Sequence, residues 1–208
     1  VDNELPNLVT NGNFSNGTTG WTNSHPSYCT IEVVNDGGEN ALKVTITQSI
    51  ATVSPYQSIP SVNTTDIYYF CGWTKGASSN IDARGSNYIS LCSTSSTRPS
   101  VDEITSDYVF TSQRSNVTNI SDNVWQRLEL NNAGENAVGN VYYWKDIKCY
   151  NLTAAYGAGN EPTKEWCDAN LEELKTLYKS QNGIARKVKK GYIGVNGVAR
   201  KFYPEPTY

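Results

Sequence analysis

Aromatic residues that alternate along one short segment carry the clearest chemistry in this sequence. Residues 68–74 read YYFCGWT, and strand alternation places Tyr69 and Trp73 on one face and Tyr68 and Phe70 on the other. Tyr and Trp combine a flat apolar ring with a polar edge, so they can stack on the C–H face of a pyranose. The alternative is ordinary packing, in which Tyr69 and Trp73 lie under a loop or against a helix near the C-terminus.

Two polar side chains could complete such a site. In residues 125–130, Leu128 and Leu130 alternate with Arg127 and Glu129, so the polar pair points away from the face that the leucines bury. Guanidinium and carboxylate groups are planar and can bind sugar hydroxyls as donor and acceptor. Residues 141–150 form a further aromatic strand, which adds Tyr143 as a candidate.

Residues suited to catalysis are sparse. The single histidine, His25, precedes a proline in a Ser- and Asn-rich loop, and the sequence has no nucleophile-elbow motif, phosphate loop or metal-ligand cluster. Glycoside hydrolysis requires two carboxylates across one cleft, whereas the adjacent acids at 102–103 and 172–173 fit a loop and a solvated helix face. We therefore expect no enzyme. A glycan-degrading enzyme, one rival hypothesis, would need paired carboxylates beside Tyr69 and Trp73.

Short strands separated by turns must hold these residues. The runs with strand character are residues 29–34, 41–46, 68–74, 88–92, 108–111, 125–130 and 141–150. Residues 35–40 (NDGGEN) form a strong turn signal between the first two runs. This spacing predicts a mainly β protein, an antiparallel jelly-roll β-sandwich, with Trp21, Trp125 and Trp144 in or beside its core.

The pattern changes after residue 152. Thr163 predicts a helix N-cap, and apolar residues then recur at spacings of four, three and four. The sequence therefore predicts one C-terminal α-helix that ends at Asn182-Gly183. Its apolar stripe consists of Cys167, Leu171, Leu174 and Tyr178.

An internal repeat occupies the last part of the chain. Residues 183–188 return at 197–202, and Asn196-Gly197 predicts a tight hairpin turn in a short β-ribbon tail. The expected organisation is a β-sandwich at 1–152, a turn plus amphipathic helix at 153–182 and a basic β-ribbon at 183–208. The basic residues of the tail could contact teichoic acid, another anionic surface or an acidic patch on a partner. Equally, they could be a solvated edge that prevents strand pairing.

Composition excludes several classes of partner. The net charge of −3 disfavours a general nucleic-acid binder, and no stretch approaches the roughly 20 apolar residues needed for membrane insertion. The five cysteines form no CxxC or Cys/His grouping, which disfavours a zinc site. We expect buried, reduced thiols, with one disulfide as the alternative.

The segments NLVTNGNF (7–14), Gly20-Trp21, ALKV (41–44), YYFCGW (68–73), WQRL (125–128) and YYWKDI (142–147) together resemble carbohydrate-binding modules of the family 4/9/22 type. The resemblance covers residues 7–152. It implies a jelly-roll sandwich whose concave sheet binds glycans. Together with strand alternation, it places on that sheet the candidate glycan-binding residues Tyr69, Trp73, Arg127, Glu129 and Tyr143.

The same resemblance raises the question of a structural calcium ion. Such modules often follow the Asn-Gly-x-Phe opening with an acidic residue that helps to hold calcium, but Ser15 stands there in this chain. Asp146 matches the acidic position of the closing strand, and Lys145 occupies the neighbouring position where a second acid is usual. Calcium prefers six to eight oxygen ligands, several of them anionic. We expect no cofactor, with a structural calcium at Asp146 as the alternative.

A second resemblance concerns the C-terminal part. Residues 151–163 (NLTAAYGAGNEPT) and 185–201 (ARKVKKGYIGVNGVARK) resemble segments of tail and minor structural proteins of phages and prophages of Gram-positive bacteria. The resemblance implies a tail-associated protein of the virion, an extracellular particle. Its expected partners are bacterial cell-surface carbohydrate, other tail subunits and further copies of itself as a homo-oligomer. The alternative is a purely structural virion protein, such as a decoration or tail-tip subunit.

Overall fold

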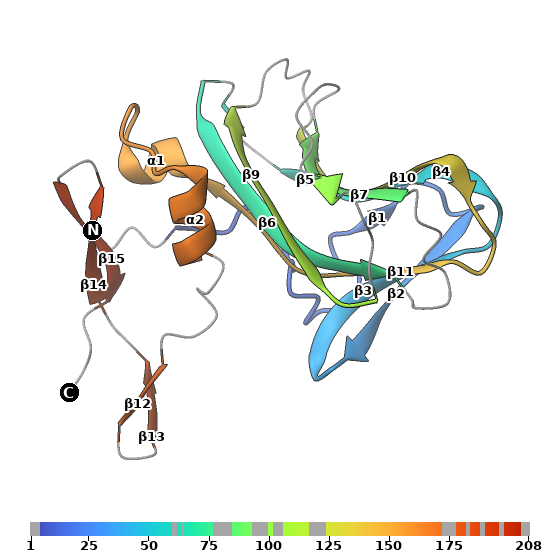
Figure 1. The fold of residues 1–208 in the computed structure, drawn as a ribbon, viewed down its shortest axis with the longest axis horizontal. Coiled ribbons are helices and arrows are strands. Elements are labelled where there is room, and N and C mark those ends of the chain that lie inside the picture. Colours follow the sequence, from blue (N-terminus) through green and yellow to red (C-terminus); the bar gives the residue numbers. More distant parts are fainter. Residues whose placement is uncertain are drawn as a thin grey trace.

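Two antiparallel β-sheets form a sandwich in this computed structural model (Figure 1). Sheet A has the order β1-β5-β10-β7-β8, and β4 also pairs with β10. Its strands are β1 (Thr22–Asn23), β4 (Ile50–Val53), β5 (Pro55–Ile59), β7 (Gly85–Cys92), β8 (Ser100–Val101) and β10 (Val124–Asn136). Sheet B has the order β2-β3-β11-β6-β9. Its strands are β2 (Cys29–Asp36), β3 (Glu39–Ile46), β6 (Ile67–Gly76), β9 (Val109–Asn116) and β11 (Val141–Asn151).

The structure describes residues 5–59, 62–63, 65–76, 85–92, 100–101, 106–116, 124–171, 178–181, 184–187, 190–195 and 198–204. For residues 85–92, 100–101, 115–116, 124–136 and all those from 178 onward, it describes the backbone alone. No helix among the described residues is both long and apolar enough to cross a membrane.

The seven strands expected from the sequence are confirmed, and the sandwich with them. Strands β1, β4, β5 and β8 were not anticipated. Strands β1 and β8 have only two residues each, which is too short for a sequence pattern. Strands β4 and β5 are separated by Ser54 alone, and β5 begins with Pro55, a residue that weakens a strand signal.

The first hydrophobic core lies between the two sheets. Leu42, Val44 and Ile46 of β3 and Trp144 of β11 are fully buried there, as the alternation of these strands requires. Trp21 is also buried, with its ring centroid 5.4 Å from that of Phe14. The prediction that Trp21 and Trp144 are core residues is confirmed, whereas the side chain of Trp125 lies outside the described part.

A second hydrophobic cluster lies on the outer face of sheet B, under two helices. Helix α1 (Leu152–Tyr156) and helix α2 (Lys164–Leu171) lie beside one end of β6 and β9 (Figure 1). We call residues 152–171 the helical layer. Buried side chains from the sheet meet buried side chains of this layer, and the cluster contains Tyr69, Cys71, Tyr150, Leu152, Tyr156, Cys167 and Leu171.

Helix α1 and the loop after it also bind the sheet through hydrogen bonds. The hydroxyl of Thr153 in α1 accepts the N–H of Ile67 at 2.8 Å and contacts the carboxylate of Glu161 in the loop at 2.6 Å. Arg114 of β9 donates from Nε to the carbonyl of Pro162 at 2.7 Å. Residues 151–163 therefore help to hold the helical layer against sheet B.

The helix predictions are partly right. Thr163 caps α2 as expected, because its hydroxyl accepts the N–H of Trp166 at 3.2 Å, and Cys167 and Leu171 are buried. The expected continuation to Tyr178 is wrong, because Tyr178 begins strand β12. Leu174 and the expected end at 182–183 lie outside the described residues. Helix α1 was not anticipated, although Asn151 gives it an N-cap by accepting the N–H of Ala154.

The C-terminal part contains two β-hairpins, and the first begins at Tyr178, before the predicted start of the β-ribbon at residue 183. One pairs β12 (Tyr178–Gln181) with β13 (Ile184–Lys187), and the other pairs β14 (Lys190–Val195) with β15 (Val198–Pro204). Val195 pairs with Val198 at the end of the second hairpin, and the turn predicted at Asn196-Gly197 lies outside the described residues.

Four cysteines are free and buried: Cys29, Cys71, Cys149 and Cys167. This confirms the expectation of reduced, buried thiols for these four, while the side chain of Cys92 lies outside the described part. Burial raises the pKa of Cys71 and of Cys167 to about 12. Both thiols therefore stay protonated at neutral pH and act as small apolar groups.

The helical layer is held by a carboxylate that collects three donors. Asp168 of α2 accepts hydrogen bonds from the hydroxyl of Tyr69 at 2.9 Å and from Ser112, and it pairs with Lys164 at 2.6 Å. Burial raises the pKa of Asp168, but the bonds from Lys164, Ser112 and Tyr69 outweigh it and bring the pKa below the ordinary 3.8. The charged form of Asp168 is therefore the form that stabilises the fold.

We predict that Asp168→Ala lowers the free energy of unfolding by about 2–3 kcal/mol at pH 7, because the buried phenol of Tyr69 loses its acceptor. A carboxyl with a lowered pKa stabilises the fold above its unfolded value and loses that contribution as pH falls. The difference from wild type should therefore shrink below about pH 4. Urea unfolding at pH 7 and at about pH 3 measures it. The exposed Asp107, changed to Ala, is the control; an equal loss there would contradict the prediction.

Candidate functional site

The structure corrects the expected role of Tyr69. Its side chain does lie on the outer face of sheet B, as alternation predicts, but it is 0% exposed. The helical layer covers the ring, and Asp168 holds the hydroxyl. A sugar cannot reach this ring, so the packing alternative holds for Tyr69.

The expected placement of Arg127 and Glu129 is also wrong. Both belong to β10, whose partners are β4, β5 and β7 in sheet A. Trp73 and Tyr143 belong to sheet B. The two pairs therefore lie in opposite sheets of the sandwich and cannot share one sheet face. The side chains of Arg127 and Glu129 lie outside the described part.

Trp73 and Tyr143 are brought together on the outer face of sheet B. They lie on neighbouring strands beyond the edge of the helical layer, and both are half-buried. In the register of β6 and β11, Trp73 faces Lys145 and Tyr143 faces Lys75. Half-buried side chains of this uncovered region, which we call the open strip, are Lys43, Trp73, Lys75, Tyr108, Phe110, Tyr143 and Lys145.

Lysine ammonium groups lie against the tyrosine rings of the open strip. The Nζ of Lys145 is 4.1 Å from the ring centroid of Tyr108, and that of Lys75 is 4.7 Å from the same centroid. Lys75 is also 4.9 Å from the ring centroid of Tyr143. At such distances the ring quadrupole attracts a cation, so these contacts hold the rings in place. Trp73 packs against Phe110, with ring centroids 5.2 Å apart.

Two carboxylates from the β2–β3 turn complete the open strip. Asp36 pairs with Lys75 at 2.5 Å and accepts the Tyr108 hydroxyl at 2.7 Å, while Glu39 pairs with Lys145 at 2.5 Å. Strands β3 and β11 separate β2 from β6, so the end of this hairpin must bend over the outer face. Gly37 and Gly38, with φ of 67° and 92°, permit the two-residue turn that the NDGGEN segment predicted.

Charges in the open strip balance one another. Lys43 pairs with Glu32 at 2.7 Å, so each lysine has one carboxylate partner. The hydrogen bond from Lys75 lowers the pKa of Asp36, and burial raises the pKa of the Tyr108 phenol. At neutral pH the strip therefore offers ammonium donors, carboxylate acceptors and partly exposed aromatic rings. This combination can hydrogen-bond a neutral polyhydroxylated ligand.

The sequence contained a signal for the residues that were missed. Lys75 follows Trp73 by two positions and Lys145 follows Tyr143 by two, so alternation alone puts these lysines on the same face as the rings. The contribution of Asp36 and Glu39 depends on how the hairpin bends, which no local pattern specifies.

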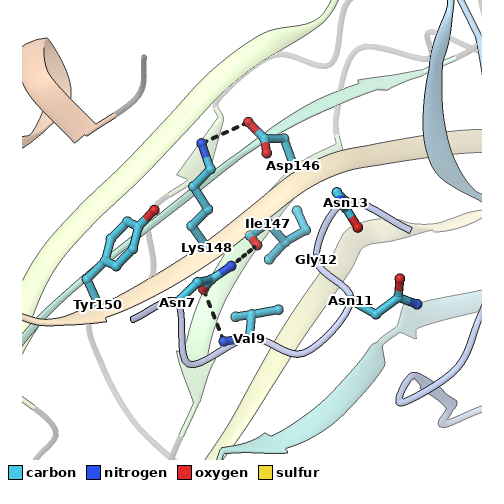
Figure 2. A pocket seen from close by; sticks show the side chains of 9 residues that line it. All are labelled: Asn7, Val9, Asn11, Gly12, Asn13, Asp146, Ile147, Lys148 and Tyr150. Atoms are coloured by element: carbon cyan, nitrogen blue, oxygen red, sulfur yellow. Dashed lines mark hydrogen bonds and ion pairs between the residues drawn. The ribbon is translucent and has the colours of Figure 1, made fainter. Parts of the chain in front are cut away.

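A second candidate region lies where the N-terminal turn meets β11 (Figure 2). Here β11 is bulged between Lys145 and Lys148, and Asp146 has a positive φ of 54°. Ile147 donates its N–H to the carbonyl of Gly12 at 2.9 Å, and Asn7 donates from Nδ2 to the carbonyl of Ile147 at 3.2 Å. These bonds line a hollow of about 350 Å³.

The donor set of this hollow does not fit calcium. Asp146 is the one carboxylate among the residues lining the hollow, and its Oδ2 is 3.0 Å from the Nζ of Lys148. The amide oxygen of Asn7 already accepts the N–H groups of Val9 and Cys149, and that of Asn11 accepts a further N–H. Among the described residues, no group of three or more His, Cys, Asp or Glu could hold a metal ion. A calcium site at Asp146 would need several anionic oxygens, which this hollow does not present.

No protein-family model and no curated protein sequence matches this chain. Solved structures do match its fold. An arabinose-bound α-L-arabinofuranosidase is similar with a TM-score of 0.53 and 12% identity, over 71% of this chain and 27% of that one. The chain has a jelly-roll fold.

Two further structures give TM-scores just below 0.5. A xylan-binding domain from Paenibacillus barcinonensis is 14% identical, over 73% of this chain and 97% of that domain, with a TM-score of 0.49. The enzymatically active domain of a bacteriophage CBA120 tailspike protein is 12% identical, over 70% of this chain and 21% of that one, also at 0.49. The fold assignment rests on the strand order and on the arabinofuranosidase.

We predict that Gly12→Ala destabilises the protein by about 3 kcal/mol or more, because an added Cβ would lie 2.0 Å from the carbonyl oxygen of Ile147. The added Cβ is fixed to the backbone of residue 12, and the oxygen belongs to the backbone of Ile147. The clash can therefore be relieved only by moving the N-terminal turn away from β11. Chemical denaturation measures the loss. Gly37→Ala is the matched control, since its Cβ meets nothing within 4 Å and costs only the left-handed backbone, about 1 kcal/mol. Equal losses in the two variants would refute the clash.

Proposed function

We propose that this chain is a tail-associated virion protein whose jelly-roll domain attaches to glycans of a bacterial surface. The open strip is the observation that carries the glycan part of the proposal. It combines the half-buried rings of Trp73, Tyr108 and Tyr143 with ammonium and carboxylate groups held at fixed positions. Sugar sites of this kind are individually weak, and many copies on one particle would make them useful.

The charge balance favours a neutral glycan as ligand. Each carboxylate at the strip is bonded to an ammonium group, so an anionic polymer would have to compete with Asp36 and Glu39 for their lysines. A neutral saccharide can instead accept from the lysines and donate to the acids without separating the pairs.

The virion part of the proposal rests on the C-terminal resemblance. In the described residues, the first segment of that resemblance, 151–163, bonds to sheet B through Thr153, and parts of the second, 185–201, form strands of the two C-terminal hairpins. In this proposal the hairpins provide contacts with other tail subunits or with further copies of the chain, and the particle is extracellular.

We propose a binding role without catalysis. The carboxylates of the open strip are paired with lysines, whereas glycoside hydrolysis requires two carboxylates that face one scissile bond. The arrangement of Asp36 and Glu39 suits hydrogen bonding to hydroxyl groups better than acid–base work on a glycosidic oxygen.

One observation favours the structural alternative. The helical layer of the chain itself covers Tyr69, the ring expected to anchor a sugar. In the alternative, the sandwich is a spacer in the virion and its surfaces serve assembly alone.

We predict that Trp73→Ala and Tyr143→Ala each weaken binding to a neutral host-wall polysaccharide by about tenfold, because truncation of a central aromatic residue removes roughly 1.4 kcal/mol or more. Pull-down and titration with purified wall polysaccharide measure the change, and circular dichroism verifies the fold. Tyr28→Ala is the control, since Tyr28 is an exposed tyrosine outside the strip.

Two outcomes would count against the proposal in different ways. If wild type binds no wall glycan at all, the structural virion role replaces the attachment role. If wild type binds but both variants bind equally well, the glycan site lies elsewhere on the sandwich.

A further inference from the structure

The ion pair at the β11 bulge is unusual in its burial. The side chains of Asp146 and Lys148 are each 10% exposed, and their charged atoms are 3.0 Å apart. The other ion pairs described here have at least one partner more exposed than this. Asp146 also adopts a left-handed backbone conformation, which is costly for a residue with a side chain. The fold therefore maintains a carboxylate at a buried and strained position.

A carboxylate in this environment requires a cation. An isolated buried charge is strongly unfavourable, and an opposite charge at hydrogen-bond distance offsets the loss of hydration. The position of Asp146 matters because Ile147, the next residue, carries two of the hydrogen bonds that attach the N-terminal segment to β11, one to Gly12 and one from Asn7. If the Asp146 carboxylate were left without a cation, the bulge would tend to move so that the carboxylate reaches water. That movement would break the hydrogen bonds of Ile147.

We propose that the ammonium group of Lys148 is a built-in cation that replaces a structural calcium ion at Asp146, so that the attachment of the N-terminal turn to β11 does not depend on divalent metal. Figure 2 shows the Lys148 side chain reaching Asp146 on one side of β11 while Asn7 bonds Ile147.

Two features of the chain support this inference. The position after the Asn-Gly-Asn-Phe opening is Ser15, which carries no charge, so the second anion that a metal would need is missing. The amide oxygen of Asn7 already accepts two backbone N–H groups, which occupy both of its lone pairs, and that of Asn11 accepts one. A lysine two residues along the same strand is present in every folded molecule, whereas occupancy by a metal follows its concentration.

The first test compares the thermal unfolding of the full wild-type chain in excess EDTA and in millimolar calcium chloride. A metal that binds only the folded state raises Tm. Because the proposal assigns the role of the cation to Lys148, we expect no such rise, and the two Tm values should agree within about 1 °C. A rise of several degrees in calcium that EDTA abolishes would overturn the proposal.

The second test removes the charge. Lys148→Met keeps an unbranched chain of similar shape, and we expect Tm to fall by roughly 10 °C because Asp146 is left buried without its partner. The double variant Asp146→Asn with Lys148→Met no longer buries a charge, so we expect it to recover at least about half of the loss.

Lys43→Met is the matched control, because Lys43 forms a comparable 2.7 Å pair with Glu32 at side-chain exposures of 27% and 56%. We expect this control to lower Tm by about 2 °C or less. The proposal fails if Lys148→Met is no worse than Lys43→Met, or if the double variant recovers nothing. Should Lys148→Met not fold, Lys148→Arg, which keeps the charge, must still fold; failure of both would show a packing requirement and overturn the role of the charge.

Discussion

Strand β6 carries aromatic residues on both faces, and this constraint decides the architecture around it. Tyr68 and Phe70 enter the core between the sheets, so Tyr69 is left on the outer face of sheet B. A sheet with such a face cannot leave it in water without a large hydrophobic cost. The helical layer covers this face as a third layer of the fold. The carboxylate of Asp168 in that layer accepts the hydrogen bond of the buried Tyr69 hydroxyl.

The extent of this third layer divides the outer face of sheet B. Beyond the helices, no further layer of described residues covers the outer face. There Lys75 and Lys145, which pair with Asp36 and Glu39, contact the ring of Tyr108 and hold it in place. At one end of this face the aromatic side chains are buried under the helical layer, and at the other end they are held by paired charges. Recognition of a ligand is feasible only at the charged end, because the other end is sealed.

Local periodicity predicted which residues share a face, and it did so correctly for Tyr69 and Trp73. It could not predict which strands are neighbours, because pairing depends on contacts distant in sequence; Arg127 was therefore placed in the wrong sheet. It also could not predict what covers a face. The signal for α2 was present in Thr163 and Cys167, but nothing local showed that this helix would lie on Tyr69 rather than in solvent.

The position of the helical layer sets the smallest piece of the chain that could stand alone. A fragment ending at residue 152, where the sequence pattern suggests a boundary, would keep every strand of both sheets yet strip the cover from Tyr69, Cys71 and Tyr150. Such a fragment would expose an apolar aromatic surface, which favours self-association. Any transplant of this jelly roll into another protein should therefore carry its chain at least as far as Leu171.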